Sequence, residues 1–341
     1  KEEMILMSKK NNVSANPAGG IMHAPVMWMK RNFGAMVALV LMCVLLSVVT
    51  DSFLVSTNIL STLRNVCVNC LIAFGITCVL ICGGIDLSVG SVAAASGVTA
   101  VQLANLGIPV IFCVIVALIL GIAVGFVNGF VVANTDLPPF IITLSTQITV
   151  RGISYILTGG QPSQCTNEGF NMLGSGNLLG LPIPVLIVIA AMIVLFFIMN
   201  RTCFGRHVYA VGGNRESARY AGVNVKLVQI RVFMLSGFTA ALAGVVLAAR
   251  LYSGQPNVGE GFERDAIAAS VLGGTSMGGG VGTLGGTVIG VLIIGVLNNG
   301  MNLLRIDTYW QYVVKGVLLL VAIITDVMSS KYIFSKRRKL K

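Results

Sequence analysis

The chain has 341 residues, of which 55% are apolar and 10% are charged, with a mean hydropathy of +0.89. Soluble domains carry about 25% charged residues, so this composition excludes a soluble globular protein and predicts an all-α polytopic membrane protein. The net charge of +11 does not indicate a nucleic-acid partner. Of the 23 Lys and Arg residues, five lie in 1–31, six in 200–231 and six in 331–341, all beside apolar runs.

Ten apolar runs are expected to cross or enter the membrane, because a span needs roughly 20 residues. In chain order they are Phe33–Val49, Val66–Cys82, Ser91–Leu106, Ile108–Ala133, Phe140–Leu157, Pro182–Met199, Val232–Leu251, Asp265–Leu272, Thr287–Leu304 and Tyr309–Val327. The third and eighth runs are short and are expected to be broken or re-entrant. One transmembrane domain over 32–328 is predicted, between a tail at 1–31 and a basic tail at 329–341.

The basic segments predict the orientation of the chain, since Lys and Arg collect on the cytoplasmic side. Both tails should be cytoplasmic, which requires an even number of spans, as ten is. The loop 200–231 follows the sixth span and should also be cytoplasmic. The segment 159–181 has no Lys or Arg and should lie outside. The first run is read as a retained span and not as a cleaved signal peptide.

A break in the apolar sequence over Gly83–Gly90 is the first candidate functional site. Gly83 and Gly84 interrupt a helix, and Asp86 or Ser88 can cap the next one. A carboxylate inside the membrane costs about 2.5–3.5 kcal/mol, so Asp86 needs partners there. Two interpretations stay open. Backbone N–H groups satisfy the carboxylate, or the broken helix lines or gates a solute path.

Other polar groups in or beside the runs are further candidates. Pro138 and Pro139 set a sharp start to the fifth run, a break that is read mainly as structural. Lys315 in the last run either pairs with an acid or extends toward the interface. Hydrogen bonding between helices is the default role of the buried amides. The remaining candidates for the path are Asn128, Phe140, Thr143, Asn298 and Asn299.

The hydrophilic loop 200–231 contains a predicted two-turn helix over Asn214–Gly222. Asn214 can cap it, Glu216 suits its first turn, and Gly222 can take the left-handed conformation that ends it. Such a short helix is marginal in water unless it docks on something. A plain connecting loop is the alternative, but a docking element for a cytoplasmic partner is the better interpretation.

Three other patterns are not expected to carry chemistry. The spacing Cys67-x-x-Cys70 resembles a metal site, but the chain has only two His residues, so its eight cysteines are read as packing residues. The glycines of 280–285 lack the βαβ unit of a dinucleotide site. No Walker A pattern or catalytic triad occurs. The chain is therefore predicted to have no catalytic residues, no metal and no cofactor of its own.

The chain resembles, from about Phe33 onward, the membrane permease subunit of bacterial ATP-binding-cassette importers for monosaccharides, the ribose, arabinose, xylose and galactose group. The matching pieces are Gly83–Gly90, Pro139–Leu144, Thr202–Arg206, Gly212–Asn214, Ala221–Val225, Asp265–Ala269, Val271–Ser276 and Asn298–Leu304. Together with Ser253–Pro256, the last two pieces look closest to ribose permeases.

This resemblance implies a multi-pass protein of the bacterial inner membrane that works as a pair. It also implies a partner ATPase that uses ATP and Mg, an extracytoplasmic sugar-binding protein, and alternating access. The surface helix would then couple the ATPase to the spans, through Gly213, Asn214, Arg215, Glu216, Ala218, Arg219 and Gly222. An ion-gradient-driven secondary transporter is the rival function, and Asp86 is its strongest candidate for ion coupling. A purely structural or receptor protein has no need of these features.

Overall fold

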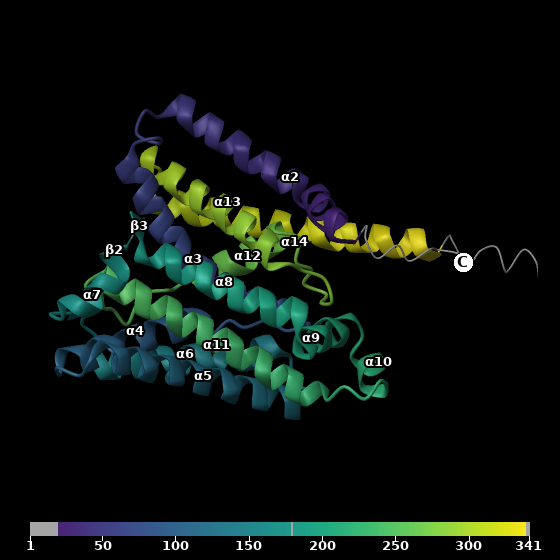
Figure 1. Ribbon diagram of the computed structural model, residues 1–341, viewed down its shortest axis with the longest axis horizontal. Helices are drawn as coiled ribbons and strands as arrows, with labels where there is room; N and C mark the ends of the chain where they lie inside the picture. The colour runs from purple at the N-terminus through teal and green to yellow at the C-terminus, as the bar shows by residue number, and fades with distance from the viewer. Residues whose placement is uncertain (1–19, 179, 339–341) are drawn as a thin grey trace, which may run out of the picture.

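The computed structural model describes residues 20–178 and 180–338, and Figure 1 shows them as a bundle of helices. Thirteen helices and four two-residue strands make up the regular structure of this part of the chain. The predicted all-α membrane fold is confirmed. The first 19 residues of the predicted N-terminal tail lie outside the described residues, and the helix α2 begins at Gly20.

Eight helices are long and apolar enough to cross a membrane. They are α2 (Gly20–Val49), α3 (Ser56–Ile81), α5 (Val110–Asn134), α6 (Pro139–Thr158), α8 (Ile183–Arg201), α11 (Val225–Arg250), α13 (Leu284–Leu303) and α14 (Thr308–Arg338). They account for eight of the ten predicted runs. The helix α14 continues to Arg338, through most of the segment that the sequence predicted as a separate tail.

The third and eighth runs form shorter helices, as expected. The helix α4 (Val89–Asn105) has 17 residues and α12 (Phe262–Leu272) has 11. At 1.5 Å per residue these reach about 25 Å and about 16 Å, less than the roughly 30 Å of a bilayer core. A non-helical stretch precedes each one, 82–88 before α4 and 255–261 before α12.

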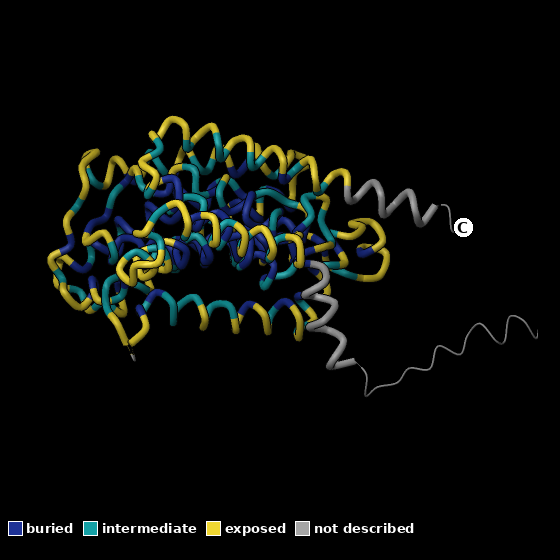
Figure 2. The backbone as a smooth tube through the Cα atoms, turned by 90° about the horizontal axis from the view of Figure 1, so that it is seen from above, coloured by how far each residue is buried: buried dark blue, intermediate teal, exposed yellow. Residues whose placement is uncertain are grey.

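The centre of the bundle is formed by α3 and α11, whose spanning windows are 83% and 78% buried. Figure 2 shows the buried backbone running through the middle, with the exposed residues on the outside. The helix α11 packs on α3, α4 and α5. Small residues allow the close approach of α5 and α11, since a Cβ atom at Gly125 would lie 2.9 Å from the Cα of Met234.

The short elements gather at the two ends of the bundle (Figure 1). One end, called the α7 end below, carries α7 (Glu168–Ser175) and two small antiparallel sheets. In these sheets β1 (Ser163–Gln164) pairs with β4 (Ser253–Gly254), and β2 (Asn177–Leu178) pairs with β3 (Leu181–Pro182). The other end, called the α10 end, carries α9 (Cys203–Gly213), α10 (Arg215–Tyr220) and the loop 273–283.

Candidate translocation path and docking surface

The carboxylate of Asp86 lies in the non-helical stretch before α4 and is only 1% exposed. Its Oδ1 atom accepts hydrogen bonds from the backbone N–H and the hydroxyl of Ser88, at 2.9 and 2.7 Å. Its Oδ2 atom accepts a bond from the Ser236 hydroxyl of α11 at 2.7 Å. Three donors thus compensate the loss of water, and one of them belongs to another helix.

The hydrogen bonds continue from Ser88 across two further helices. The Asn128 amide of α5 donates to Ser88 Oγ at 2.9 Å. Thr146 Oγ1 of α6 then donates to Asn128 Oδ1 at 2.6 Å. We call the five residues Ser236, Asp86, Ser88, Asn128 and Thr146 the buried polar chain. It fixes the break to α5, α6 and α11.

Thr143 and Phe140 lie on the first turns of α6 but face different surroundings. Thr143 Oγ1 is buried, accepts the Leu87 N–H at 3.1 Å and donates toward backbone carbonyls. It therefore holds the same break from the α6 side. Phe140 is 46% exposed and makes no hydrogen bond to the buried polar chain through its apolar side chain. The structure brings Asp86, Ser88, Asn128 and Thr143 together, and it leaves Phe140 outside this group.

The break before α12 meets the break before α4. A Cβ atom on Gly90 would lie 2.8 Å from Glu263 Oε2, and Gly259 packs against the Gly90 backbone. Arg151 of α6 holds this second break by donating from Nη1 to the carbonyls of Pro256 and Val258, at 2.6 and 2.5 Å. The starts of two short helices therefore lie together inside the bundle, an arrangement that lines solute sites in transporters.

Sequence reasoning missed Arg151, Glu263 and Ser236 as residues of this region. A signal existed for Arg151, because it is the one charged residue in the run 140–157, and charges inside spans generally face a protein interior. Glu263 is only 5% exposed, and its position just before a short run was also readable. Ser236 is an ordinary serine in a long span, and nothing in the sequence marks it as a partner of Asp86.

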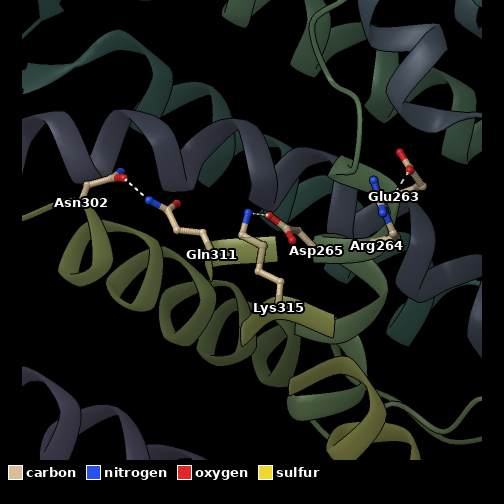
Figure 3. Close-up of polar contacts among 6 residues, drawn as sticks. All are labelled: Glu263, Arg264, Asp265, Asn302, Gln311 and Lys315. Atoms are coloured by element: carbon tan, nitrogen blue, oxygen red, sulfur yellow. Dashed lines mark hydrogen bonds and ion pairs between the residues drawn. The ribbon is translucent and has the colours of Figure 1, made fainter. Parts of the chain in front are cut away.

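Asn298 and Asn299 do not join the buried polar chain. The amides of Asn299 and Asn58 exchange two hydrogen bonds, at 2.7 and 3.2 Å, which join α13 to α3. This is the interhelical role that was the default for buried amides. Lys315 pairs with Asp265 of α12 at 2.9 Å, so the alternative of pairing with an acid is the one the structure shows (Figure 3).

The predicted surface helix is present as α10, a single capped element at the α10 end. Asn214 Oδ1 accepts the N–H of Ser217 at 2.7 Å, as an N-cap does. Gly222 has φ of +83°, and its N–H bonds to the carbonyl of Arg219, which ends the helix. Ala218 is buried against the bundle, so one face of α10 is anchored.

The other face of α10 is open to a partner. Gly213, Arg215, Glu216 and Arg219 are exposed, and Tyr220 is 88% exposed. The Arg215 guanidinium also donates to Gln229 Oε1 of α11 at 2.9 Å, which links the surface helix to a central span. The preceding helix α9 was not predicted. Its cap is Thr202, whose Oγ1 accepts the N–H of Gly205.

Within the described residues no group of three His, Cys, Asp or Glu side chains could hold a metal ion. Most of the cysteines are buried and all eight are free thiols. The absence of a cofactor stays a prediction.

Spanning helices with paired internal breaks and a capped surface helix define a membrane permease. Comparison with known proteins agrees. Residues 58–323 match the family described as branched-chain amino acid transport system / permease component, and the chain belongs to this family.

Relatives with assigned functions match almost the whole chain. The ribose import permease of Bacillus subtilis (strain 168) is 43% identical over 298 residues, which are 87% of this chain and 92% of the relative. The L-arabinose transport system permease of Escherichia coli (strain K12) is 39% identical over 307 residues, covering 88% and 91%. The D-allose transport system permease of the same strain is 40% identical over 282 residues, covering 82% and 86%. No solved structure matches the chain.

Proposed function

We propose that this chain is the membrane-spanning subunit of an ATP-driven importer of a monosaccharide, with a ribose-type pentose as the favoured substrate. The observation that carries the proposal is α10, a capped surface helix with an exposed basic face. A helix of six residues needs packing partners; buried Ala218 anchors one face of α10 on the bundle. Its other face is open, and a partner ATPase is the expected partner there in a chain related to sugar permeases. The ATPase, and not this chain, would use ATP and Mg.

In this proposal the α10 end is cytoplasmic and the α7 end faces the extracytoplasmic sugar-binding protein. The basic residues beside α10 support that orientation, and it places both termini in the cytoplasm of a bacterial cell. The binding protein would dock on the segments 159–181 and 251–264. Two copies of the chain would form the importer, and the sugar would pass by alternating access.

The buried polar chain has a positioning role in this mechanism. Asp86, Ser88 and Asn128 are joined by hydrogen bonds, and Thr143 accepts the Leu87 N–H beside them. They hold the break before α4 as a fixed element against which other helices move. Phe140 is exposed on α6 and remains a candidate for the translocation path between two copies. Asn298 and Asn299 lie away from the buried polar chain, near the α7 end.

Uptake of labelled ribose tests the function. Cells would express this chain with its ATPase and binding protein, and uptake would be compared after ATP depletion and after collapse of the ion gradients. Loss of uptake on ATP depletion alone is the expected result. Loss on gradient collapse with ATP intact would instead support a secondary transporter. Asp86 is a poor coupling residue for that rival, because its two oxygens already accept three hydrogen bonds.

A further inference from the structure

An open apolar groove lies on the surface of the bundle where α5, α8, α9 and α11 meet. It has a volume of about 310 Å³. Its apolar walls include Ile122 of α5, Ile198 of α8, Phe204 of α9, and Met234 and Phe238 of α11. The spanning windows of α5 and α8 are only 22% and 17% buried. The groove therefore lies on a side of the bundle that faces outward, where lipid can reach it.

The groove lies in the half of the membrane next to the α10 end. Ile198 is in the last turn of α8, which ends at Arg201, and Phe204 is in the first turn of α9. A lipid in this groove would therefore have its headgroup at the α10 end and its acyl chains toward the middle of the membrane.

Arg231 is the one charged residue that lines the groove, and its side chain is exposed. The ion pairs in the described part of the chain are Arg264–Glu263 and Lys315–Asp265, and no side-chain hydrogen bond there engages Arg231. A guanidinium is a planar fork of donors that matches phosphate oxygens well. Arg231 therefore offers a free cation directly beside an apolar surface.

Arg201 adds a second positive charge at the same end. It is exposed and lies three residues after Ile198, so the two residues share one face of α8. No acidic residue lines the groove. An apolar floor with cations at one end matches an anionic lipid, and basic pockets between spanning helices bind lipid headgroups in this way.

A second groove along the same helices provides a comparison. It has a volume of about 380 Å³ and lies at the α7 end, between α5, α7, α8 and α11. Val114, Leu173, Ile187 and Val245 are among its lining residues, all of which are apolar. Both grooves can accept an acyl chain, but only the groove at the α10 end carries a cation. Only that groove is expected to distinguish one headgroup from another.

The size of the groove favours a narrow chain over a protein helix. Its volume equals about 4 Å of a helix roughly 10 Å wide, which is less than one turn. A small soluble anion could meet Arg231 but would leave the apolar floor uncovered. A phospholipid with a net negative charge satisfies both parts of the groove.

From these observations we infer that the groove binds an anionic glycerophospholipid, such as phosphatidylglycerol, from the leaflet at the α10 end. Its phosphate would contact Arg231 and Arg201, and one acyl chain would cover the apolar floor. The site would be present whatever solute the chain transports. Gln229, two residues before Arg231, accepts the bond from Arg215 of α10 at 2.9 Å. The lipid would therefore lie beside the part of α11 that anchors the surface helix.

The test is native mass spectrometry of the purified full-length chain, titrated with phosphatidylglycerol or phosphatidylcholine that carry the same acyl chains. The parent should bind phosphatidylglycerol about fivefold more tightly, because one basic group near an anionic lipid contributes about that factor. Arg231→Gln should lose this preference and leave the affinity for phosphatidylcholine unchanged. Arg231→Lys keeps the charge and should keep most of the preference.

Arg305→Gln is the matched control. Arg305 is also exposed, but it lies in the turn between α13 and α14 and lines neither groove. Its replacement removes the same charge and should leave both affinities unchanged. Ile122→Trp fills the groove without changing the charge and should weaken the binding of both lipids. Thermal unfolding would show which variants are folded, and Arg231→Lys against Arg305→Gln keeps the comparison usable if Arg231→Gln does not fold.

Four results would overturn the lipid site. They are equal affinity of the parent for the two lipids, unchanged phosphatidylglycerol binding by Arg231→Gln, the same loss in Arg305→Gln as in Arg231→Gln, and displacement of phosphatidylglycerol by sn-glycerol 3-phosphate. The third result would show an effect of net charge alone. The fourth would show a site for soluble phosphate esters, which have no acyl chain to occupy the groove.

Discussion

The two breaks of the bundle place short helices against each other, but they are held in different ways. At the break before α4 both oxygens of the Asp86 carboxylate are paired, and the bonds continue to three helices. At the break before α12, Arg151 Nη2 and Glu263 Oε2 are buried without a hydrogen-bond partner in the described part of the chain. A fully paired network rigidifies a core, whereas an incompletely paired one is less stable locally. The first break is therefore a fixed frame, and the second is the one expected to move.

The largest expected effect is on the fixed frame. Asp86→Ala leaves the Ser88 N–H and the hydroxyls of Ser88 and Ser236 without their acceptor, at a cost of about 3 kcal/mol. Folded yield and the thermal unfolding midpoint in detergent should fall sharply. Asp86→Asn keeps an acceptor oxygen and a similar shape, so it should retain most of the transport rate. An Asp86→Ala variant as stable as the parent would contradict the claim that Asp86 fixes the break before α4.

The next largest effect is expected at the second break, the one before α12, and it tests how this break differs from the first. Arg151→Met removes the two bonds to the carbonyls of Pro256 and Val258 but keeps an apolar stem of similar length. Ribose uptake should fall about tenfold, with a smaller loss of thermal stability than Asp86→Ala, because the change acts on a single segment. Arg151→Lys keeps a donor and a charge and should recover part of the rate.

The Arg151 prediction distinguishes a moving break from a fixed one. If Arg151→Met lowered stability as much as Asp86→Ala did, the two breaks would be equally structural. Normal uptake by Arg151→Met would show that the hydrogen bonds from Arg151 to the carbonyls of Pro256 and Val258 have no part in transport.

The sequence predicted the framework of the site better than its connections. The helical class, the two shortened runs and the capped helix at Asn214–Gly222 are readable, because composition, glycine breaks and cap residues act locally. The Ser236–Asp86 bond joins residues 150 positions apart, so it depends on how α11 packs. The grouping of Asp86 with Asn128, and the separation of Asn299 from both, depend likewise on packing that no local pattern encodes.

A third effect concerns the coupling between α10 and the break before α12, which is the break expected to move. Gly222 has φ of +83° with open space around its Cβ position, so Gly222→Val introduces backbone strain of about 1–2 kcal/mol and no clash. The end of α10 should be disturbed, and sugar-stimulated ATPase activity of the complex should fall several-fold.

Gly107→Val is the matched control for Gly222→Val. Gly107 has φ of +79° and also has open space around it, but it lies in the turn between α4 and α5. It should lower thermal stability by a similar amount and leave ATPase stimulation unchanged. Equal loss of stimulation in both variants would mean that strain alone, and not α10, accounts for the effect.

The smallest effect tests whether the Asn58–Asn299 amide pair, near the α7 end, belongs to the part of the bundle that stays fixed. Asn58 and Asn299 exchange two hydrogen bonds between α3 and α13. Asn58→Leu and Asn299→Leu should each destabilise the fold by about 1 kcal/mol, because each leaves one amide unpaired. The double variant should cost less than the sum of the two, since it removes both partners together. Chemical unfolding of the four proteins gives the coupling energy. Additive losses would show that the two amides are not energetically coupled. A defect in sugar uptake with no change in stability would make Asn299 a group that meets the solute and would extend the moving region from the second break to α13.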